Sequence, residues 1–161
     1  MMRTFRLALP LALLVLASMS FADFSRPTEN VWLGGPPSEA DLDAMVEEGL
    51  GLVIDLRTSE EGIEETEQAA RDRGLRYLNI AVGRELADED LVAETGAALE
   101  QALADGERVL LHCASGNRAG EIWARHRVQQ GISAERALAE SRASGTRGER
   151  LEQLQEILAA E

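Results

Sequence analysis

The chain has 161 residues, 45% of them hydrophobic, so it is long enough to bury the core of one domain. Its formal net charge is −13, and all 16 basic residues are arginine. A surface this acidic repels nucleic acid and anionic lipid, so we expect neither as a partner.

The amino-terminal segment has the features of a secretory signal peptide. Arg3 and Arg6 form a basic start, Leu7–Met19 is almost wholly apolar, and small residues precede a cleavage site after Ala22. The apolar run is shorter than the roughly 20 residues of a membrane span. We therefore expect a cleaved signal, a domain over residues 23–161 and a periplasmic or secreted bacterial location, with no stable membrane association. An uncleaved anchor is the alternative.

The exported part is expected to begin with an irregular lead-in and a first strand. Asp23–Asn30 is polar, whereas Val31–Leu33 is a short apolar run. The Gly-Gly-Pro-Pro sequence that follows ends this strand. Ser38 and Asp41 have the spacing of a capping box at the start of a helix, and Gly49 marks its end.

Two strands and two helices are predicted in the middle of the chain. Leu52–Leu56 is a continuous apolar run, which is typical of a parallel strand covered on both faces. A helix is expected over Ile63–Arg73 and a strand over Tyr77–Val82. Apolar residues at helical spacing then predict a helix over Asp88–Ala104.

The last third contains a strand, a loop and three predicted helices. The strand Val109–His112 leads directly into the loop Cys113–Arg118. Helices are expected over Ala119–Gln130, Ser133–Arg142 and Arg147–Ala160. This alternation predicts a single α/β domain with a parallel-rich sheet of about four or five strands and helices on both faces.

The carboxyl ends of parallel strands meet at one edge of a sheet, where ligands bind. The loops expected there are Arg57–Gly62, Gly83–Asp88 and Cys113–Arg118. The last of them joins a strand to a helix amino terminus, whose unpaired N–H groups attract anions and stabilise a thiolate. We therefore predict an anion site at this edge.

The loop Cys113–Arg118 has the residues of a phosphate site with a thiolate nucleophile. Cys113 would attack phosphorus and form a phosphocysteine, while the planar Arg118 guanidinium would bind two phosphate oxygens. Gly116 permits backbone conformations that side chains block. The Ser115 hydroxyl is a candidate donor to the thiolate or the leaving group. The backbone N–H groups expected to bind phosphate belong to Ala114, Ser115, Gly116, Asn117 and Arg118.

Cys113 is the only cysteine, which excludes an internal disulfide framework. A single thiol in an exported chain is either reactive or an inert core residue. The glycine and arginine that follow favour the reactive interpretation. One cysteine and two histidines show no metal-ligand spacing, so we expect no metal and no cofactor.

Several neighbouring residues are expected to support the loop. His112 should point away from Cys113, because successive strand residues face opposite sides, and so should order the loop rather than act as a base. Asp55 and Arg57, at the end of a predicted strand, are expected to form an anchoring ion pair. Asn117 is a candidate to hold the loop in place.

The reaction also needs a general acid to protonate the leaving oxygen. The loop Gly83–Asp88 offers two carboxylates, Glu85 and Asp88. Glu85 lies in the middle of the loop and is the preferred acid. Asp88 has the position of a helix N-cap, which is its alternative role.

The sequence resembles the cysteine phosphatase superfamily, whose signature is His-Cys, five residues and Arg. His112-Cys113 and Arg118 match, but four residues intervene, and Ala119 replaces the usual Ser or Thr. The shorter loop is more similar to the phosphatase-like domain of beta-lactamase-hydrolase-like proteins, a bacterial branch of tyrosine and dual-specificity phosphatases. This resemblance implies metal-independent hydrolysis of phosphate monoesters, phosphotyrosine-like or small aryl or alkyl phosphates, on a small molecule or a phosphoprotein. It covers Gly34–Leu42, Val53–Arg57, Asn79–Val82 and His112–Arg118.

Two alternatives stay open. Rhodanese-like sulfurtransferases often have a Cys-x-x-Gly-x-Arg loop, and Ile54–Glu61 resembles their early strand and turn. They usually continue with a Gly-His-Ile segment, where this chain has the helix-like Ile63–Arg73. The other alternative is a module that binds phosphate or another anion without turnover.

Overall fold

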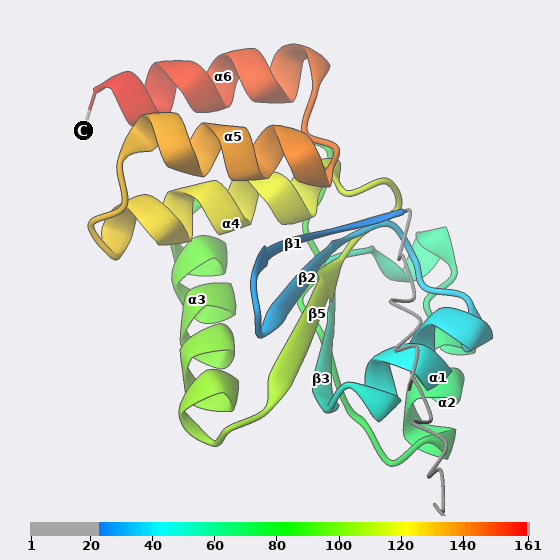
Figure 1. Ribbon diagram of the computed structural model, residues 1–161. Coiled ribbons are helices and arrows are strands. Elements are labelled where there is room, and N and C mark those ends of the chain that lie inside the picture. Colours follow the sequence, from blue (N-terminus) through cyan, green and yellow to red (C-terminus); the bar gives the residue numbers. More distant parts are fainter. Residues whose placement is uncertain (1–22, 161) are drawn as a thin grey trace, which may run out of the picture.

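Five strands form one sheet at the centre of the computed structural model, which describes residues 23–160 (Figure 1). The strand order is β1-β2-β5-β3-β4, and all neighbours are parallel except β1 and β2. The predicted signal segment lies outside the described residues. The strands are β1 (Phe24–Thr28), β2 (Val31–Gly34), β3 (Leu50–Asp55), β4 (Arg76–Asn79) and β5 (Arg108–His112).

The lead-in Asp23–Asn30 is not irregular, as we predicted, because most of it is strand β1. This strand turns back and pairs antiparallel with β2 at the edge of the sheet, with Phe24 opposite Gly34. An edge strand tolerates proline and polar residues, and no residue of β1 is fully buried. The apolar periodicity that reveals a covered strand is therefore absent.

The predicted strand Tyr77–Val82 is shorter in the structure, where β4 ends at Asn79. The chain nevertheless stays beside the end of β3. The Ile80 N–H donates to the Asp55 carbonyl at 3.0 Å, and the Val82 N–H donates to the Leu56 carbonyl at 3.0 Å. The loop after β4 therefore starts next to the loop after β3.

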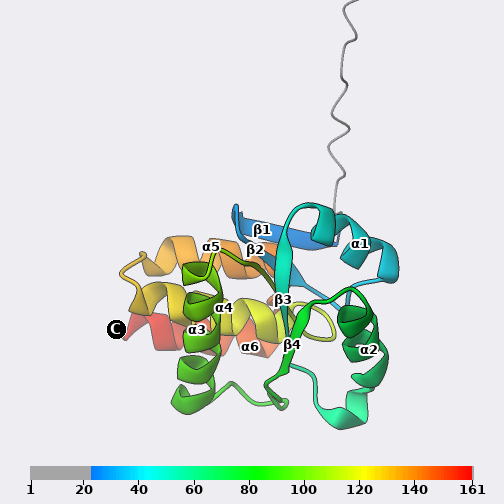
Figure 2. The same cartoon turned by 90° about the horizontal axis from the view of Figure 1, so that it is seen from below.

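Helices cover both faces of the sheet. Helices α1 and α2 lie on one face and α3 and α4 on the other, while α5 and α6 pack against α4 (Figure 1, Figure 2). A short 3₁₀ helix follows β3 at Ser59–Glu61. The α-helices are α1 (Glu39–Glu47), α2 (Glu64–Asp72), α3 (Glu89–Ala104), α4 (Asn117–Gln129), α5 (Ala134–Ser144) and α6 (Gly148–Ala159).

Side-chain caps mark the starts of α1 and α3. Ser38 and Asp41 form the predicted capping box at the start of α1. The Asp88 side chain accepts from the Leu91 N–H at 2.9 Å and caps α3. Each cap satisfies backbone N–H groups that lack a partner within the helix.

The alternation of strand side chains divides the core into two layers. Ile54 and Leu111 pack toward α3 and α4, whereas Val53 and Leu110 pack toward α1 and α2. Runs such as these are apolar throughout because both faces of the parallel strands are buried. The same alternation carries Cys113 to the α4 side.

Helix α3 crosses α4 where Gly96 meets the buried ring of His126. A β-carbon at Gly96 would lie 2.7 Å from His126 Nδ1. We predict that Gly96→Ala lowers stability, because overpacking costs about 1–3 kcal/mol and outweighs the helix propensity gained, about 1 kcal/mol at most. Urea unfolding measures this effect. The control Gly83→Ala, with no atom within 4 Å of its β-carbon, should keep the wild-type midpoint or raise it slightly. A wild-type midpoint for Gly96→Ala would contradict the prediction.

Candidate active site

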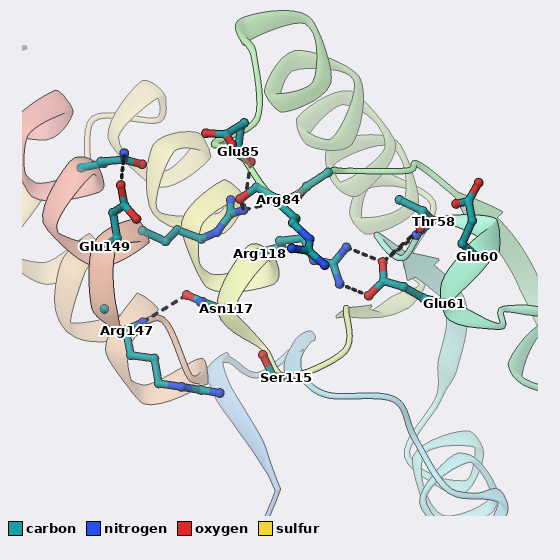
Figure 3. Close-up of a pocket in the computed structure, with 14 residues that line it drawn as sticks. Thr58, Glu60, Glu61, Arg84, Glu85, Ser115, Asn117, Arg118, Arg147 and Glu149 are labelled. Atoms are coloured by element: carbon teal, nitrogen blue, oxygen red, sulfur yellow. Dashed lines mark hydrogen bonds and ion pairs between the residues drawn. The ribbon is translucent and has the colours of Figure 1, made fainter.

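Three loops and the start of α6 surround a pocket at the carboxyl edge of the sheet (Figure 3). The pocket has a volume of about 1120 Å³. The loops are those predicted to meet there, after β3, β4 and β5; the contribution of α6 was not predicted. Residues from all four segments line the pocket, among them Glu61, Arg84, Glu85, Asn117, Arg118 and Arg147.

Cys113 follows β5, and its side chain is fully buried. Its N–H donates to the Gly34 carbonyl at 3.2 Å, which continues the pairing of β5 with β2. The thiol belongs to the core layer between the sheet and α4. The predicted nucleophile is therefore shielded from solvent by the loop that carries it.

The Cys113 loop is short because α4 begins at Asn117, two residues before the predicted start at Ala119. Gly116 is the residue before the helix and has a φ of +80°. A β-carbon on Gly116 would lie 1.7 Å from the Ser144 carbonyl oxygen, so only glycine fits. Ser115 and Gly116 thus pack against the end of α5.

Asn117 joins the loop to α6. Its side-chain oxygen accepts from the Arg147 N–H at 3.1 Å, and its backbone carbonyl accepts from the Thr146 hydroxyl at 3.2 Å. Figure 3 shows Asn117 and Arg147 facing each other across one side of the pocket. The residue expected to hold the loop does so by fixing it to the segment before α6.

Arg118, at the end of the third loop, binds the first loop and the start of the second. Its two terminal nitrogens donate to the two carboxylate oxygens of Glu61 at 2.7 and 2.6 Å, and Nη1 also donates to the Val82 carbonyl at 2.8 Å. Hydrogen bonding to Glu61 raises the pKa of Arg118 against the effect of burial, and the charge of the neighbouring Cys113 acts in the same direction as Glu61. The predicted phosphate-binding group is thus near the thiol, but a carboxylate occupies its terminal nitrogens.

Glu61 was not among the predicted site residues. One of its oxygens also accepts from the Thr58 N–H at 2.9 Å, so it caps the 3₁₀ helix and binds Arg118 at once. The hydrogen bond from Arg118 lowers the pKa of Glu61 to about 2. The sequence signal is the Thr-x-x-Glu spacing of a capping box, which reveals the cap but not its distant partner.

The expected ion pair of Asp55 and Arg57 is present beneath the loops. Arg57 Nε and Nη2 donate to the Asp55 carboxylate at 3.1 and 2.7 Å, and the Tyr77 hydroxyl donates to it at 2.8 Å. Arg57 Nη1 also donates to the Gly62 carbonyl at 3.1 Å. Despite burial, the hydrogen bonds from Arg57 hold the pKa of Asp55 below its usual range. The pair anchors the loop after β3.

His112 lies on the opposite face of β5 from Cys113, beside Asp55. Its Nε2 is 3.5 Å from an Asp55 carboxylate oxygen. Burial lowers the pKa of His112 to about 4, so the imidazole is neutral at pH 7. This placement suits a supporting residue and not a base that acts on the thiol.

The two candidate acids have different surroundings. Glu85 is exposed on the loop after β4 and lines the pocket, at its rim in Figure 3. The carboxylate of Asp88 is used as the α3 cap. Of these two carboxylate residues, Glu85 is therefore the one that lines the pocket.

Residues 23–160 are the described part of the chain. No group of three or more His, Cys, Asp or Glu side chains in this part of the chain is arranged to hold a metal ion. None of its helices is long and apolar enough to cross a membrane.

A strand that leads through the loop Cys113–Arg118 into a helix, at the carboxyl edge of a mostly parallel sheet, is the arrangement expected for a cysteine-dependent phosphatase. The chain belongs to the family described as DSP-PTPase phosphatase fused to NAD+ kinase, whose model matches residues 15–158. This confirms the superfamily expected from the sequence. Among curated proteins, none matches the chain.

Solved structures share this fold at low sequence identity. A DUF442 protein from Shewanella putrefaciens CN-32 is 18% identical, with a TM-score of 0.67 over 85% of this chain and 91% of that one. The active form of Tk-PTP is 21% identical, with a TM-score of 0.68 over 88% and 99% of the two chains. PTPMT1 is 20% identical, with a TM-score of 0.69 over 85% and 94%. These similarities establish the fold.

The Glu61–Arg118 pair should contribute stability that depends on pH. Because the folded pKa of Glu61 is about 2, below its usual 4.5, the contribution is complete above about pH 5 and is lost as pH falls toward 2. We predict that Glu61→Gln lowers the urea midpoint at pH 6 and that its difference from wild type narrows at pH 3.5.

The control is Glu65→Gln, which removes an exposed carboxylate from α2. At pH 6, its urea midpoint should differ from that of wild type by less than the Glu61→Gln midpoint does. If the urea midpoints of Glu61→Gln and wild type differ by the same amount at pH 6 and at pH 3.5, the Glu61–Arg118 pair does not form in solution.

Proposed function

We propose that the chain is a cysteine-dependent phosphatase that hydrolyses phosphate monoesters through a phosphocysteine intermediate. One observation carries this proposal: Cys113 leads directly into the amino terminus of α4, and Ser115, Asn117 and Arg118 of the same loop line the pocket at the carboxyl edge of the sheet. Membership in a phosphatase family supports the same reaction.

The reaction would proceed in two displacements at phosphorus. The Cys113 thiolate forms an S–P bond as the ester P–O bond breaks, and the leaving oxygen takes a proton from the Glu85 carboxyl. Water then attacks phosphorus and loses a proton to the Glu85 carboxylate, and the S–P bond breaks. The products are an alcohol, inorganic phosphate and the original thiolate.

Charge on the phosphate oxygens would be stabilised by fixed donors. The backbone N–H groups from Ala114 to Arg118 open α4, and the positive end of the helix dipole lies there. Arg118 is held by Glu61 and Val82, so its cation is oriented before a substrate binds. The backbone donors need no reorganisation and therefore stabilise a transition state most effectively, whereas Arg118 has to exchange Glu61 oxygens for phosphate oxygens.

The pocket wall favours polar substrates. No aromatic side chain lines the pocket in the described part of the chain, and charged residues such as Arg84, Glu85 and Arg147 surround it. We therefore propose small phosphate esters or a phosphoprotein as substrates, without a preference for the phosphotyrosine ring.

Two observations support a second candidate, an anion-binding module without turnover. Ala119 carries no hydroxyl, and Glu61 occupies both terminal nitrogens of Arg118. Such a module would bind phosphate in the same loop and release it unchanged. Activity measurements separate the two candidates.

Cys113→Ser tests the nucleophile. We expect wild-type protein to hydrolyse an aryl phosphate and the variant to lose at least about 10³-fold in kcat, because a hydroxyl is a far weaker nucleophile than a thiolate. Phosphate release measures the rate, and vanadate inhibition reports binding. Sulfur transfer from thiosulfate to cyanide without phosphatase activity would identify a sulfurtransferase instead. Tight vanadate binding with neither activity would identify the binding module.

The variants Glu85→Gln and Asp88→Asn distinguish the proposed general acid from the residue that caps α3. We predict that Glu85→Gln removes the alkaline limb of the kcat–pH profile and lowers kcat by about 10²-fold on an ester with a poor leaving group. Asp88→Asn should leave rate, profile and stability near wild type, since asparagine is an equally good N-cap. A wild-type profile for Glu85→Gln would exclude it as the acid.

The amino-terminal segment supports the proposal that this phosphatase is exported. Its basic start, apolar run and small residues before Ala22 have the pattern of a cleaved signal peptide. The substrates would then be phosphate esters in the periplasm or outside the cell.

A further inference from the structure

A buried charged cluster lies beneath the loop that carries Glu85. The Glu121 side chain, on α4, is fully buried. One carboxylate oxygen accepts from the Ala87 N–H at 3.0 Å and lies 3.3 Å from Arg125 Nη1; the other accepts from Arg150 Nη1, on α6. Burial raises the pKa of Glu121, and the two guanidiniums oppose this effect.

The second terminal nitrogen of Arg150 binds the loop itself. Nη2 donates to three successive backbone carbonyls, those of Gly83 at 3.3 Å, Arg84, and Glu85 at 2.9 Å. The Ala87 carbonyl accepts from Arg125. The backbone of a loop without regular structure is thus fixed by charged side chains from α4 and α6, and the Arg84 and Glu85 side chains line the pocket.

The cluster also links this loop to the nucleophile loop. Glu121 lies three residues after Arg118 in the same helix, which begins directly after the Cys113 loop. A rigid helix therefore sets the distance between the anion site and the carboxylate that holds Arg150. Because Arg150 also binds the three loop carbonyls, the position of Glu121 fixes the position of the loop backbone relative to the anion site.

We propose that Arg150, held by Glu121, is a positioning residue that fixes the Gly83–Ala87 loop so that Glu85 can protonate the leaving group. This inference rests on the proposed phosphatase function. A buried ion pair often stabilises a fold no better than apolar residues of similar volume. Such residues would supply no donors to the loop carbonyls, whereas the planar fork of arginine supplies them together with the carboxylate bond.

The experiment compares two phosphate esters. 2,4-Dinitrophenyl phosphate has a good leaving group that hardly needs an acid, whereas phenyl phosphate depends on one. We expect Arg150→Met to lower kcat about 10²-fold on phenyl phosphate, the size of a misplaced catalytic group, and less than about 5-fold on the dinitrophenyl ester. KM should change little. Arg150→Lys keeps a charge opposite Glu121 and should fall between wild type and Arg150→Met; it replaces Arg150→Met if that variant does not fold.

A double-mutant cycle with Glu85 shows whether Arg150 acts through the acid. In Glu85→Gln protein, adding Arg150→Lys should change kcat on phenyl phosphate less than about 2-fold, because the acid is already lost. Full additivity of the two losses, or an equal loss on both esters, would overturn the inference.

Arg142→Met is the matched control, since Arg142 is exposed on the neighbouring helix α5. It should keep wild-type kcat on both esters. Absence of hydrolysis of either ester by wild-type protein would contradict the proposed function, and the positioning role with it. If wild-type protein hydrolyses both esters and an Arg150 variant has the same kcat values as Arg142→Met, the positioning role alone is contradicted.

Discussion

The contact between Gly116 and the Ser144 carbonyl constrains the whole site. Gly116 needs a positive φ to turn the chain from β5 into α4, and the carbonyl fills the space where a side chain would begin. A β-carbon at Gly120, one turn later, would lie 2.2 Å from the hydroxyl oxygens of Ser144 and Thr146 and 2.8 Å from the Ser141 carbonyl oxygen, so α4 and the end of α5 pack closely together. The Cys113 loop cannot change its shape without moving α5.

Arginine side chains connect the loops that surround the pocket. Arg57 binds Gly62 in the first loop, Arg118 connects the first loop to the start of the second, and Arg150 binds the second to α4. Each guanidinium bonds a carboxylate and backbone carbonyls together, which a lysine ammonium does not do in a fixed plane. The chain contains no lysine, and the cations at its pocket are arginines, whose guanidinium groups are best suited to bind the carbonyl groups of loops without regular structure.

Local sequence signals predicted most of the fold. Apolar runs identified β2, β3, β4 and β5, and capping residues such as Ser38 and Asp88 identified helix starts, because these signals act within a few residues. The edge strand β1 was missed, since its pairing with β2 and not its own pattern makes it a strand. The loops of the site were predicted from strand order, but Glu61 and Arg150 were not, because their partners lie 57 and 29 residues away in sequence.

The core also explains why Ala119 replaces the hydroxyl residue common in similar enzymes. Because α4 begins at Asn117, position 119 faces inward, fully buried in the same apolar layer as Cys113 and Ile122. A hydroxyl at this depth would need a partner to offset its desolvation, and alanine avoids this cost. In the proposed reaction, the Cys113 thiolate is therefore stabilised by the loop N–H groups and by Arg118. With four residues between Cys113 and Arg118 and no hydroxyl after the arginine, the fixed geometry of this loop matters more than it does in a loop where a hydroxyl assists.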